Sequence, residues 1–371
     1  MAKFTDLFDD VTKYATKIPS CEYLGNGLYP IIDQGQKYIS GYTDKKEGLY
    51  TDVPAIIFGD HTRVIKYVDF PCFLGADGVK LLKSDRISNH KFLYYALLNV
   101  HIPDTGYNRH FKWLKEAEIT IPSEIEQNHI VDVLDKLTDL TVLRKKQLEK
   151  LDELVKSRFI EMFGEPIANP MGWKVKPLKT LSELITNGNT PKGGSENYVE
   201  SGVIFLRSQN VWRNKIELDD VAYIDAATHQ SMKKSSLHFK DILITKTGRI
   251  NTENSSLGRA ALFLGKDDSA NINGHVYLVR LNGSILPEFV VTILTGEAYR
   301  KYIRKVCVGG IDKRQINVDQ VEEFPIITPP MELQYEFVAF KKLIDKSKLA
   351  VQKSLEQLET LKKSLMQKYF G

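Results

Sequence analysis

Residues 122–164 and 329–371 carry apolar side chains at helical spacing. In both stretches an apolar residue recurs every three or four positions, as on one face of an amphipathic helix. Pro122 and Pro329 precede the stripes, where a missing backbone N–H costs nothing, and Gly164 and Gly371 follow them as helix stops. The stripes consist of Ile130, Val133, Leu134, Leu137, Leu140, Leu148, Leu151, Val155, Phe159 and Met162, and of Phe337, Phe340, Ile344, Val351, Leu355, Leu358, Leu361, Leu365 and Tyr369.

These two stretches are copies of one another. They align without a gap at an offset of 207 residues (329 − 122), and 12 of the 43 aligned pairs are identical, among them Gln127/Gln334 and Phe163/Phe370. Both copies follow a short apolar run that ends in proline, and both end in Phe-Gly. The chain is therefore expected to consist of two similar halves, each a globular part followed by a long helix.

A long helix with one narrow apolar stripe needs a partner, and the other copy is the simplest one. We therefore predict that the two helices pair as an antiparallel coiled coil. The alternative is that each helix packs separately on its own domain. The residues expected to form the pairing are Leu137, Leu148, Leu151, Val155, Ile344, Leu355, Leu358 and Leu365.

The regions before each helix have the pattern of mixed α/β domains. Short β-type runs alternate with turn signals such as residues 75–78 and 192–194, and helical pieces are expected near 90–100 and 287–304. The predicted strands are 29–32, 55–58, 64–68, 203–206, 241–245, 260–264 and 276–279. The fold class is therefore α+β, with an internal pseudo-two-fold repeat. The predicted divisions are domain 1 (1–121), helix 1 (122–164), domain 2 (165–328) and helix 2 (329–371).

Composition narrows the class of protein only slightly. The 371 residues are 42% hydrophobic and 26% charged, as in folded soluble chains, and the net charge of +4 is compatible with a polyanionic partner. Cys21, Cys72 and Cys307 are scattered and form no metal-binding or disulfide pattern. There is no apolar run long enough to span a membrane and no signal peptide, so a cytoplasmic protein is expected.

Motifs for catalysis are missing from the sequence. The glycine-rich segment 188–194 lacks the spacing and the Lys-Ser/Thr of a phosphate-binding loop, and the eight histidines show no metal-ligand spacing. Thr328-Pro-Pro-Met331 lacks the Asn and the aromatic residue of an amino-methyltransferase motif, and Pro103-Asp104 lacks the lysine of a nuclease site. We therefore expect no catalytic residue, no bound metal and no cofactor.

Polar, basic and aromatic residues gather at the turns of both globular regions. Arg and Lys can bind guanine edges or phosphates, and Asn and Gln can bind adenine edges, so these turns are candidate DNA contacts. For any one residue the alternative is a solvated turn. The candidates are Gln36, Lys37, Tyr42, His61, Thr62, Arg63, Lys66, Asn108 and Arg109 in the first half, and Arg207, Gln209, Asn210, Lys246, Thr247, Arg249, Asn273, His275, Lys313 and Arg314 in the second.

The chain as a whole resembles the DNA-specificity subunit of bacterial type I restriction–modification enzymes. The likeness lies in the duplicated layout, in residues 29–42 and 55–62, in the helix entry 119–127, and in the helix ends at Phe-Gly. The resemblance implies two target-recognition domains that each read half of a split double-stranded DNA sequence. It also implies helices that set the half-site distance and dock two methyltransferase subunits, with restriction/translocase subunits completing the complex.

We therefore expect a non-catalytic, sequence-specific DNA-recognition subunit that acts in DNA methylation and phage defence. Two alternatives remain open at this point. The chain could be a DNA methyltransferase or nuclease with its own active site, although no cofactor or metal motif supports this. It could also be a coiled-coil scaffold that binds no DNA, although this leaves the clustered Lys, Arg, Gln and Asn residues unexplained.

Overall fold

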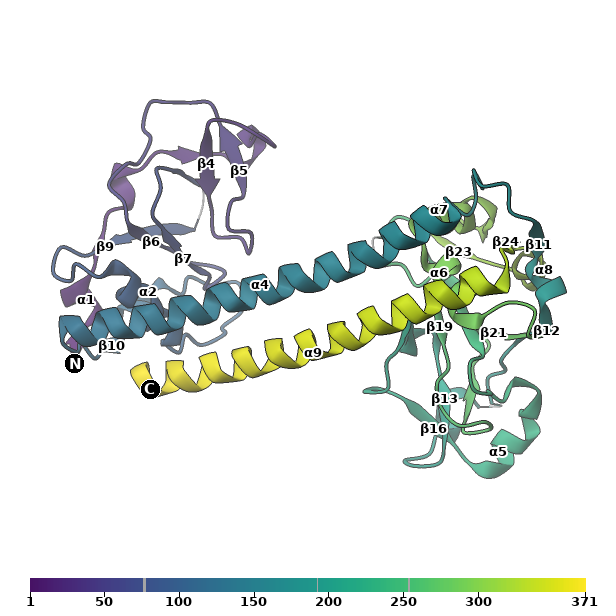
Figure 1. Cartoon of the computed structure of the whole chain (residues 1–371). Helices are drawn as coiled ribbons and strands as arrows, with labels where there is room; N and C mark the ends of the chain where they lie inside the picture. The colour runs from purple at the N-terminus through teal and green to yellow at the C-terminus, as the bar shows by residue number, and fades with distance from the viewer. Residues whose placement is uncertain (76–77, 192, 253) are drawn as a thin grey trace. The chain divides into compact units, whose positions relative to one another are not determined.

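The computed structural model describes residues 1–75, 78–191, 193–252 and 254–371, so parts of the turns predicted at 75–78 and 192–194 lie outside the described residues. The chain divides into two compact units, and each is described by itself. Unit 1 comprises Met1–Leu148 and Ala350–Gly371, and unit 2 comprises Glu149–Leu349. The division cuts both long helices, α4 (Glu124–Phe163) and α9 (Met331–Phe370). Each unit therefore holds one globular region with part of each helix (Figure 1).

The globular region of unit 1 is built on two four-stranded sheets. One has the order β2-β9-β6-β7 and is antiparallel, and the other has the order β3-β8-β4-β5 and is mixed. The elements are β1 (Ala2–Lys3), α1 (Phe4–Leu7), β2 (Asp9–Asp10), η1 (Thr12–Tyr14), β3 (Lys17–Ile18), η2 (Ser20–Glu22), β4 (Tyr29–Ile32), β5 (Gly41–Thr43), β6 (Ala55–Gly59), β7 (Ile65–Val68), β8 (Phe73–Gly75), β9 (Val79–Lys83), α2 (His90–Asn99), α3 (Phe111–Lys115) and β10 (Glu118–Ile119).

The globular region of unit 2 is built around the antiparallel sheet β12-β21-β17-β19, with smaller sheets beside it. The small sheets are β16-β13-β20, β18-β23-β22, β14-β15 and β11-β24. The elements are β11 (Val175–Pro177), η3 (Leu178–Leu181), β12 (Ser182–Asn187), η4 (Gly194–Asn197), β13 (Val203–Leu206), η5 (Ser208–Asn210), β14 (Val211–Trp212), β15 (Lys215–Ile216), β16 (Ala222–Ile224), α5 (Ala226–Ser231), η6 (Lys233–Ser235), β17 (Ile242–Thr245), β18 (Thr247–Arg249), β19 (Ala260–Leu262), β20 (Ala270–Ile272), β21 (Val276–Leu281), α6 (Pro287–Thr295), α7 (Glu297–Val306), β22 (Val308–Gly309), β23 (Lys313–Gln315), α8 (Val318–Glu322) and β24 (Pro325–Ile327).

The α+β class and the seven predicted strands are confirmed, with ends that shift by a residue or two. The single helical piece expected at 287–304 was wrong in one respect. Gly296 adopts an extended conformation (φ −63°, ψ 151°) and separates α6 from α7. The predicted piece is therefore two helices, and α7 carries Arg304 and Lys305 in its last turn.

The two copies of the repeat begin and end in the same way. Gln127 donates from Nε2 to the Pro122 carbonyl oxygen at 2.9 Å, and its counterpart Gln334 donates to Pro329 at 2.8 Å. Both helices contain 40 residues. Each glutamine thus satisfies a carbonyl group at the strand-to-helix junction. The identical junctions explain why glutamine stands at this position in both copies.

The C-terminal phenylalanine of each helix enters a hydrophobic core. Phe163 is fully buried in unit 2, where its ring lies 4.9 Å from that of Phe289. Phe370, the equivalent residue of α9, packs against Phe92 of unit 1 with ring centroids 5.5 Å apart. Each helix end is therefore part of a domain core, which makes the two Phe-Gly endings a direct structural requirement.

The helices contact each other in antiparallel order within each unit. In unit 1, Lys362 donates to Thr138 Oγ1 at 2.8 Å and Lys145 lies 3.7 Å from Glu359. In unit 2, Lys348 pairs with Asp152 at 2.6 Å and Arg158 pairs with Glu336 at 2.7 Å. In both units the partner number falls along α9 as it rises along α4, so the pairing is antiparallel in each (Figure 1).

The residues predicted to pair α4 with α9, here called the seam, differ in how far they are buried. Leu137 is buried, whereas Leu148, Leu151, Val155, Ile344, Leu355, Leu358 and Leu365 are half-buried. Leu140 and Leu361, which belong to the predicted stripes, are exposed. The helix-pairing role of these individual residues stays a prediction.

Substitutions in the seam should therefore lower the free energy of unfolding by amounts that depend on how far each residue is buried. We expect Leu358→Asp to lower the free energy of unfolding by about 2 kcal/mol, because it places a charge against a half-buried apolar surface. Leu361→Asp, a control less than one turn away at an exposed position, should cost less than about 0.5 kcal/mol. Urea unfolding followed by circular dichroism measures both. Equal losses for the two variants would contradict the assignment of Leu358 to the seam.

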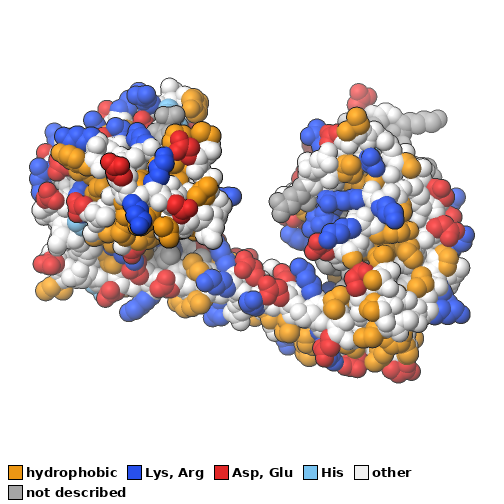
Figure 2. Space-filling model, turned by 90° about the horizontal axis from the view of Figure 1, so that it is seen from above, with side chains coloured by type: hydrophobic (Ala, Val, Ile, Leu, Met, Phe, Trp, Pro, Cys, Tyr) orange, Lys and Arg blue, Asp and Glu red, His pale blue; other side chains and the backbone are white. Residues whose placement is uncertain are grey.

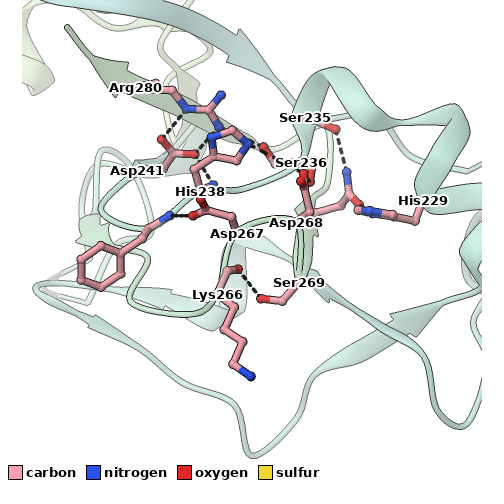
Figure 3. Close-up of polar contacts among 12 residues, drawn as sticks. His229, Ser235, Ser236, His238, Asp241, Lys266, Asp267, Asp268, Ser269 and Arg280 are labelled. Atoms are coloured by element: carbon pink, nitrogen blue, oxygen red, sulfur yellow. Dashed lines mark hydrogen bonds and ion pairs between the residues drawn. The ribbon is translucent and has the colours of Figure 1, made fainter.

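A buried ion pair fixes the central sheet of unit 2. Arg280 on β21 donates from Nε and Nη2 to the two carboxylate oxygens of Asp241, at 2.9 and 2.7 Å, and Asp241 also accepts the His238 backbone N–H at 2.7 Å (Figure 3). Nearby, Ser236 donates to Asp268 and His229 contacts the Asn271 side chain. The carboxylate of Asp241 is only 2% exposed. The pair of Asp241 and Arg280 thus joins the residue before β17 to β21.

Candidate nucleic-acid interface

Three loops of the first globular region meet beside the β6–β7 turn. Thr62 donates from Oγ1 to the Gln34 carbonyl oxygen at 2.6 Å, and the His61 backbone N–H donates to Gln34 Oε1 at 3.2 Å. Arg63 donates to the Asp104 carboxylate at 2.7 Å and to the Ile102 carbonyl at 3.3 Å. Segments near 34, 62 and 104 are thereby brought together, although they are far apart in the sequence.

An exposed aromatic stack lies on this junction. The rings of His61 and Tyr107 are stacked with centroids 4.6 Å apart and planes 8° from parallel, and His61 Nδ1 donates to the Asn108 carbonyl at 3.1 Å. Tyr107 is 87% exposed, and Asn108 and Arg109 are exposed beside it. The neighbouring residue Asp60 is buried, and its carboxylate accepts a hydrogen bond from the Phe111 backbone N–H at 2.7 Å. The arrangement presents a flat ring and several polar groups on a rigid base.

Lys66, one of the candidate DNA contacts, is used inside the domain. Its ammonium group is buried and donates to the carbonyl oxygens of Asp33 and Lys37 at 2.7 and 2.6 Å. Burial lowers the pKa of Lys66, and the nearby Asp33 carboxylate opposes that shift. Lys66 therefore holds the loop that carries the exposed side chains of Gln36 and Lys37. Tyr42 lies half-buried on β5.

The second globular region brings two candidate segments into one small sheet. Strand β18 pairs with β23 so that Thr247 lies opposite Gln315 and Arg249 lies opposite Lys313. Lys246 precedes this sheet with its ammonium group 5.8 Å from the Tyr277 ring, and Arg314 lies on β23. Arg249 and Asp312 form an exposed ion pair at 3.3 Å, which contributes little stability and can exchange for another anion.

The segment 207–210 is used mainly inside the domain. The candidate Asn210 is 2% exposed, and its side-chain Nδ2 donates to the carbonyl oxygens of Glu217 and Asp220. Arg207 and Gln209 both bind the Asp220 carboxylate, at 3.1 and 3.0 Å. The hydrogen bond from Gln209, followed by that from Arg207, lowers the pKa of Asp220. These contacts fix the β13–β14 connection.

Asn273 and His275 form the turn before β21. Asn273 Oδ1 accepts the His275 backbone N–H at 3.0 Å, and His275 is exposed. The backbone N–H of Lys246 donates to the His275 carbonyl at 2.8 Å. This turn therefore lies next to the start of the β18–β23 sheet.

Three arginines that are not among the predicted DNA contacts lie on α7 and directly before β19. Arg259, Arg300 and Arg304 are distant in the sequence from most of the predicted contacts, and only the spacing of Arg300 and Arg304 by one helical turn gave a signal. Lys and Arg side chains gather on the faces of both globular regions that Figure 2 shows.

Among the described residues, no cluster of His, Cys, Asp and Glu could hold a metal ion. None of the described helices could cross a membrane.

The comparisons with known proteins agree on one family. Residues 3–153 match the model of the type I restriction modification DNA specificity domain. A chain of Methanocaldococcus jannaschii, provisionally named the MjaX type I restriction enzyme specificity subunit, is 26% identical over 202 residues, or 54% of this chain and 46% of that one. The EcoR124I/EcoR124II specificity subunit of Escherichia coli is 26% identical over 239 residues, or 57% and 59%. The matched parts thus span about half of these relatives.

The fold agrees with solved structures over the whole chain. The crystal structure of a type I restriction–modification S subunit from M. genitalium superposes with a TM-score of 0.60 at 18% identity, and the match covers 100% of this chain and 95% of that one. A second type I structure, described in terms of complex assembly and conformational transition, gives a TM-score of 0.52 at 15% identity. Together these findings show that residues 3–153 match a type I restriction modification DNA specificity domain, and that the chain is similar in sequence and fold to type I specificity subunits.

Proposed function

We propose that this chain is a non-catalytic subunit that selects the DNA sequence on which a type I restriction–modification complex acts. The observation that carries the proposal is the presence, in each globular region, of loops that present exposed basic, amide and aromatic side chains on a rigid sheet. Loops on a rigid scaffold are suited to reading base edges, while their Lys and Arg residues bind phosphates.

The recognised sequence is split, with each globular region reading one half. The support is the internal repeat, which gives each half its own sheets, its own core and its own loop cluster. In this proposal residues 1–121 and 165–328 are the two recognition domains, and α4 and α9 set the distance between the half-sites. A helix of 40 residues is about 60 Å long at about 1.5 Å per residue, so it spans slightly less than two turns of a DNA duplex at about 34 Å per turn.

The two helices also provide docking surfaces for partners. Val142 and Leu349 occupy equivalent positions in the repeat, as do Leu154 and Leu361, and all four are 45–67% exposed. Pairing of α4 with α9 thus leaves the same apolar positions uncovered on each helix. Two equivalent surfaces suit two copies of one partner, so the proposed partners are two methyltransferase subunits, joined by restriction/translocase subunits.

The proposal is tested by DNA binding and methyl transfer with the full chain. We expect salt-dependent binding to random duplex DNA, alone or with a methyltransferase partner, and methyl transfer from S-adenosylmethionine only when that partner is present. Methyl transfer by the chain alone would favour the enzyme alternative. Failure to bind any duplex at low salt, with or without the partner, would favour the scaffold alternative.

Two residues at the β18–β23 sheet allow a base contact to be distinguished from a phosphate contact. We expect Arg249→Ala to weaken binding to the cognate site by about 1–3 kcal/mol and to relax preference at one base pair, as for a lost guanine contact. Lys246→Ala should weaken all sequences alike and reduce the salt slope by about one, as for a lost phosphate contact. Titrations on cognate and scrambled duplexes at several salt concentrations measure both effects.

Lys353→Ala is the matched control, because Lys353 is an exposed lysine on α9, outside the globular regions. It should change neither the affinity nor the preference. If Arg249→Ala and Lys246→Ala behave like this control, the β18–β23 sheet does not face DNA.

A further inference from the structure

The repeat extends from the long helices into the globular regions. Helices α2 and α7 lie at the same offset of 207 residues (297 − 90) that relates α4 to its copy, and so do α3 and α8. Leu114 of α3 and Val321 of α8 occupy equivalent positions, and both are fully buried. The loops 100–110 and 307–317, which join these helices, are therefore the same connection in the two halves of the chain.

Each of these two loops presents one apolar side chain to solvent. Tyr107 is 87% exposed, more than any other aromatic side chain among the described residues, and Ile311 is 89% exposed. A single exposed apolar side chain is ordinary on a protein surface. Exposure on the same loop in both halves indicates a shared role, because a side chain in solvent adds no packing energy to either domain.

The loop that carries Tyr107 is held in place on the β6–β7 turn. Arg63 Nη2 donates to the Asp104 carboxylate at 2.7 Å, and the His61 ring contacts the Asn108 carbonyl oxygen through Nδ1 at 3.1 Å. The same His61 ring covers one face of the Tyr107 ring. An inserted ring needs both faces free to lie between two base pairs, so this arrangement suits a contact at a base edge.

The loop that carries Ile311 is held from two sides. Strands β22 and β23 form a hairpin, and Arg314 Nε donates back to the Gly310 carbonyl at 3.2 Å. On the other side of the tip, the Ile250 backbone N–H donates to the Asp312 carbonyl at 3.1 Å. The residues on both sides of Ile311 are thus anchored, while its own side chain remains in solvent.

Polar and charged residues flank both apolar side chains. Asn108 and Arg109 follow Tyr107 and are exposed, and Lys313 is exposed close to Ile311. A protein partner is bound mainly through a continuous apolar patch, whereas these side chains stand among hydrogen-bonding groups. The major groove of DNA has a matching composition, since its base edges are polar except for the C5-methyl group of thymine.

We propose that Tyr107 and Ile311 each contact the C5-methyl group of a thymine, one in each half of the recognised sequence. The methyl group lies in the major groove and distinguishes T·A from A·T, so the contact adds to what the neighbouring polar side chains read. It involves no phosphate, and it should therefore not change the salt dependence of binding. The inference rests on the proposed DNA-binding function and names a feature of the base that each loop recognises.

Removing methyl groups from the DNA tests the contact without altering the protein. Each thymine of the cognate duplex is replaced in turn by deoxyuridine, and binding by the full chain with its methyltransferase partner is measured. One replacement in each half-site should weaken binding about three- to fivefold, as for one buried methyl group, with an unchanged salt slope. Deoxyuridine in the spacer between the half-sites is the control and should leave the affinity unchanged.

Protein variants assign each methyl group to a side chain. Tyr107→Ala should weaken cognate binding about fivefold, leave binding to a scrambled duplex unchanged, and abolish the deoxyuridine effect in one half-site only. Ile311→Ala should do the same for the other half-site. Tyr107→Phe retains the ring and should retain the effect. Tyr14→Ala is the control, since Tyr14 is a 68% exposed tyrosine on η1 of the same region, and it should change none of these quantities.

The outcomes separate this inference from the proposed function. If the parent chain binds its cognate duplex and no deoxyuridine replacement weakens binding, the methyl contacts are excluded while the DNA-binding function stands. The contacts are also excluded if the alanine variants stay as sensitive to the same methyl groups as the parent chain, or if they weaken cognate and scrambled duplexes equally. If the parent chain binds no duplex, the proposed function itself fails.

Discussion

Exchanging residues 165–328 for the matching stretch of a relative is expected to change one half of the recognised DNA sequence completely and to leave the other half unchanged. The reason is that the second globular region has its own core, which includes the fully buried Tyr277, Phe289 and Phe324. That core also receives Phe159, Phe163 and Phe337 from the long helices. The exchanged chain must therefore keep α4 and α9. The donor of residues 165–328 must have an equivalent pocket for these three rings.

The reciprocal exchange of residues 1–121 is the matched control. It should alter the other half-site, because the first core is closed by Ile130, Leu134 and Phe370 from the helices in the same way. Methylome sequencing of hosts that carry each exchanged chain with its methyltransferase measures both half-sites at once. A single exchange that altered both halves of the sequence would contradict the modular account.

Removing the charge of Asp241 is expected to destabilise unit 2 by about 3–5 kcal/mol. In Asp241→Asn the guanidinium of Arg280 loses its only paired carboxylate among the described residues, yet it remains only 20% exposed. The amide also places an N–H₂ group where the carboxylate accepted from Arg280 and from the His238 N–H. Hydrogen exchange of the β17 and β21 amides in the folded chain reports the loss for this unit alone.

Asp267→Asn is the control for this substitution. Asp267 is a nearby aspartate that accepts a hydrogen bond from the Phe239 backbone N–H at 2.6 Å at an exposed position. Its loss should cost less than about 1 kcal/mol. A comparable loss for both variants would mean that the buried pair of Asp241 and Arg280 contributes no more to the sheet than a surface turn does.

The long helices were predictable from the sequence because their signal is repeated. The apolar stripe, the proline entry and the glycine stop each occur twice, and Gln127 and Gln334 make the same hydrogen bond. Depth of burial was less predictable. Leu140 and Leu361 belong to the predicted apolar stripes but are exposed, because two paired helices cover only part of each apolar face.

The sequence did not predict which candidate contacts are exposed, because a turn sequence does not show which polar groups form hydrogen bonds inside the domain. Lys66 and Asn210 were chosen as polar residues near turns, but each satisfies buried carbonyl groups inside its domain. Arg259 and Arg300 lie in segments without a motif, and the packing of Gly258 against Ile303 of α7 brings these two segments together.

Selection of bound duplexes from a random-sequence pool, with the full chain and its methyltransferase partner, tests the central claim most directly. The account predicts an enriched sequence in two short parts, separated by a spacer of fixed length in which any base is accepted. It further predicts that Arg249→Ala relaxes one base pair in one part and none in the other. A single uninterrupted sequence, or no enrichment despite binding, would contradict the account.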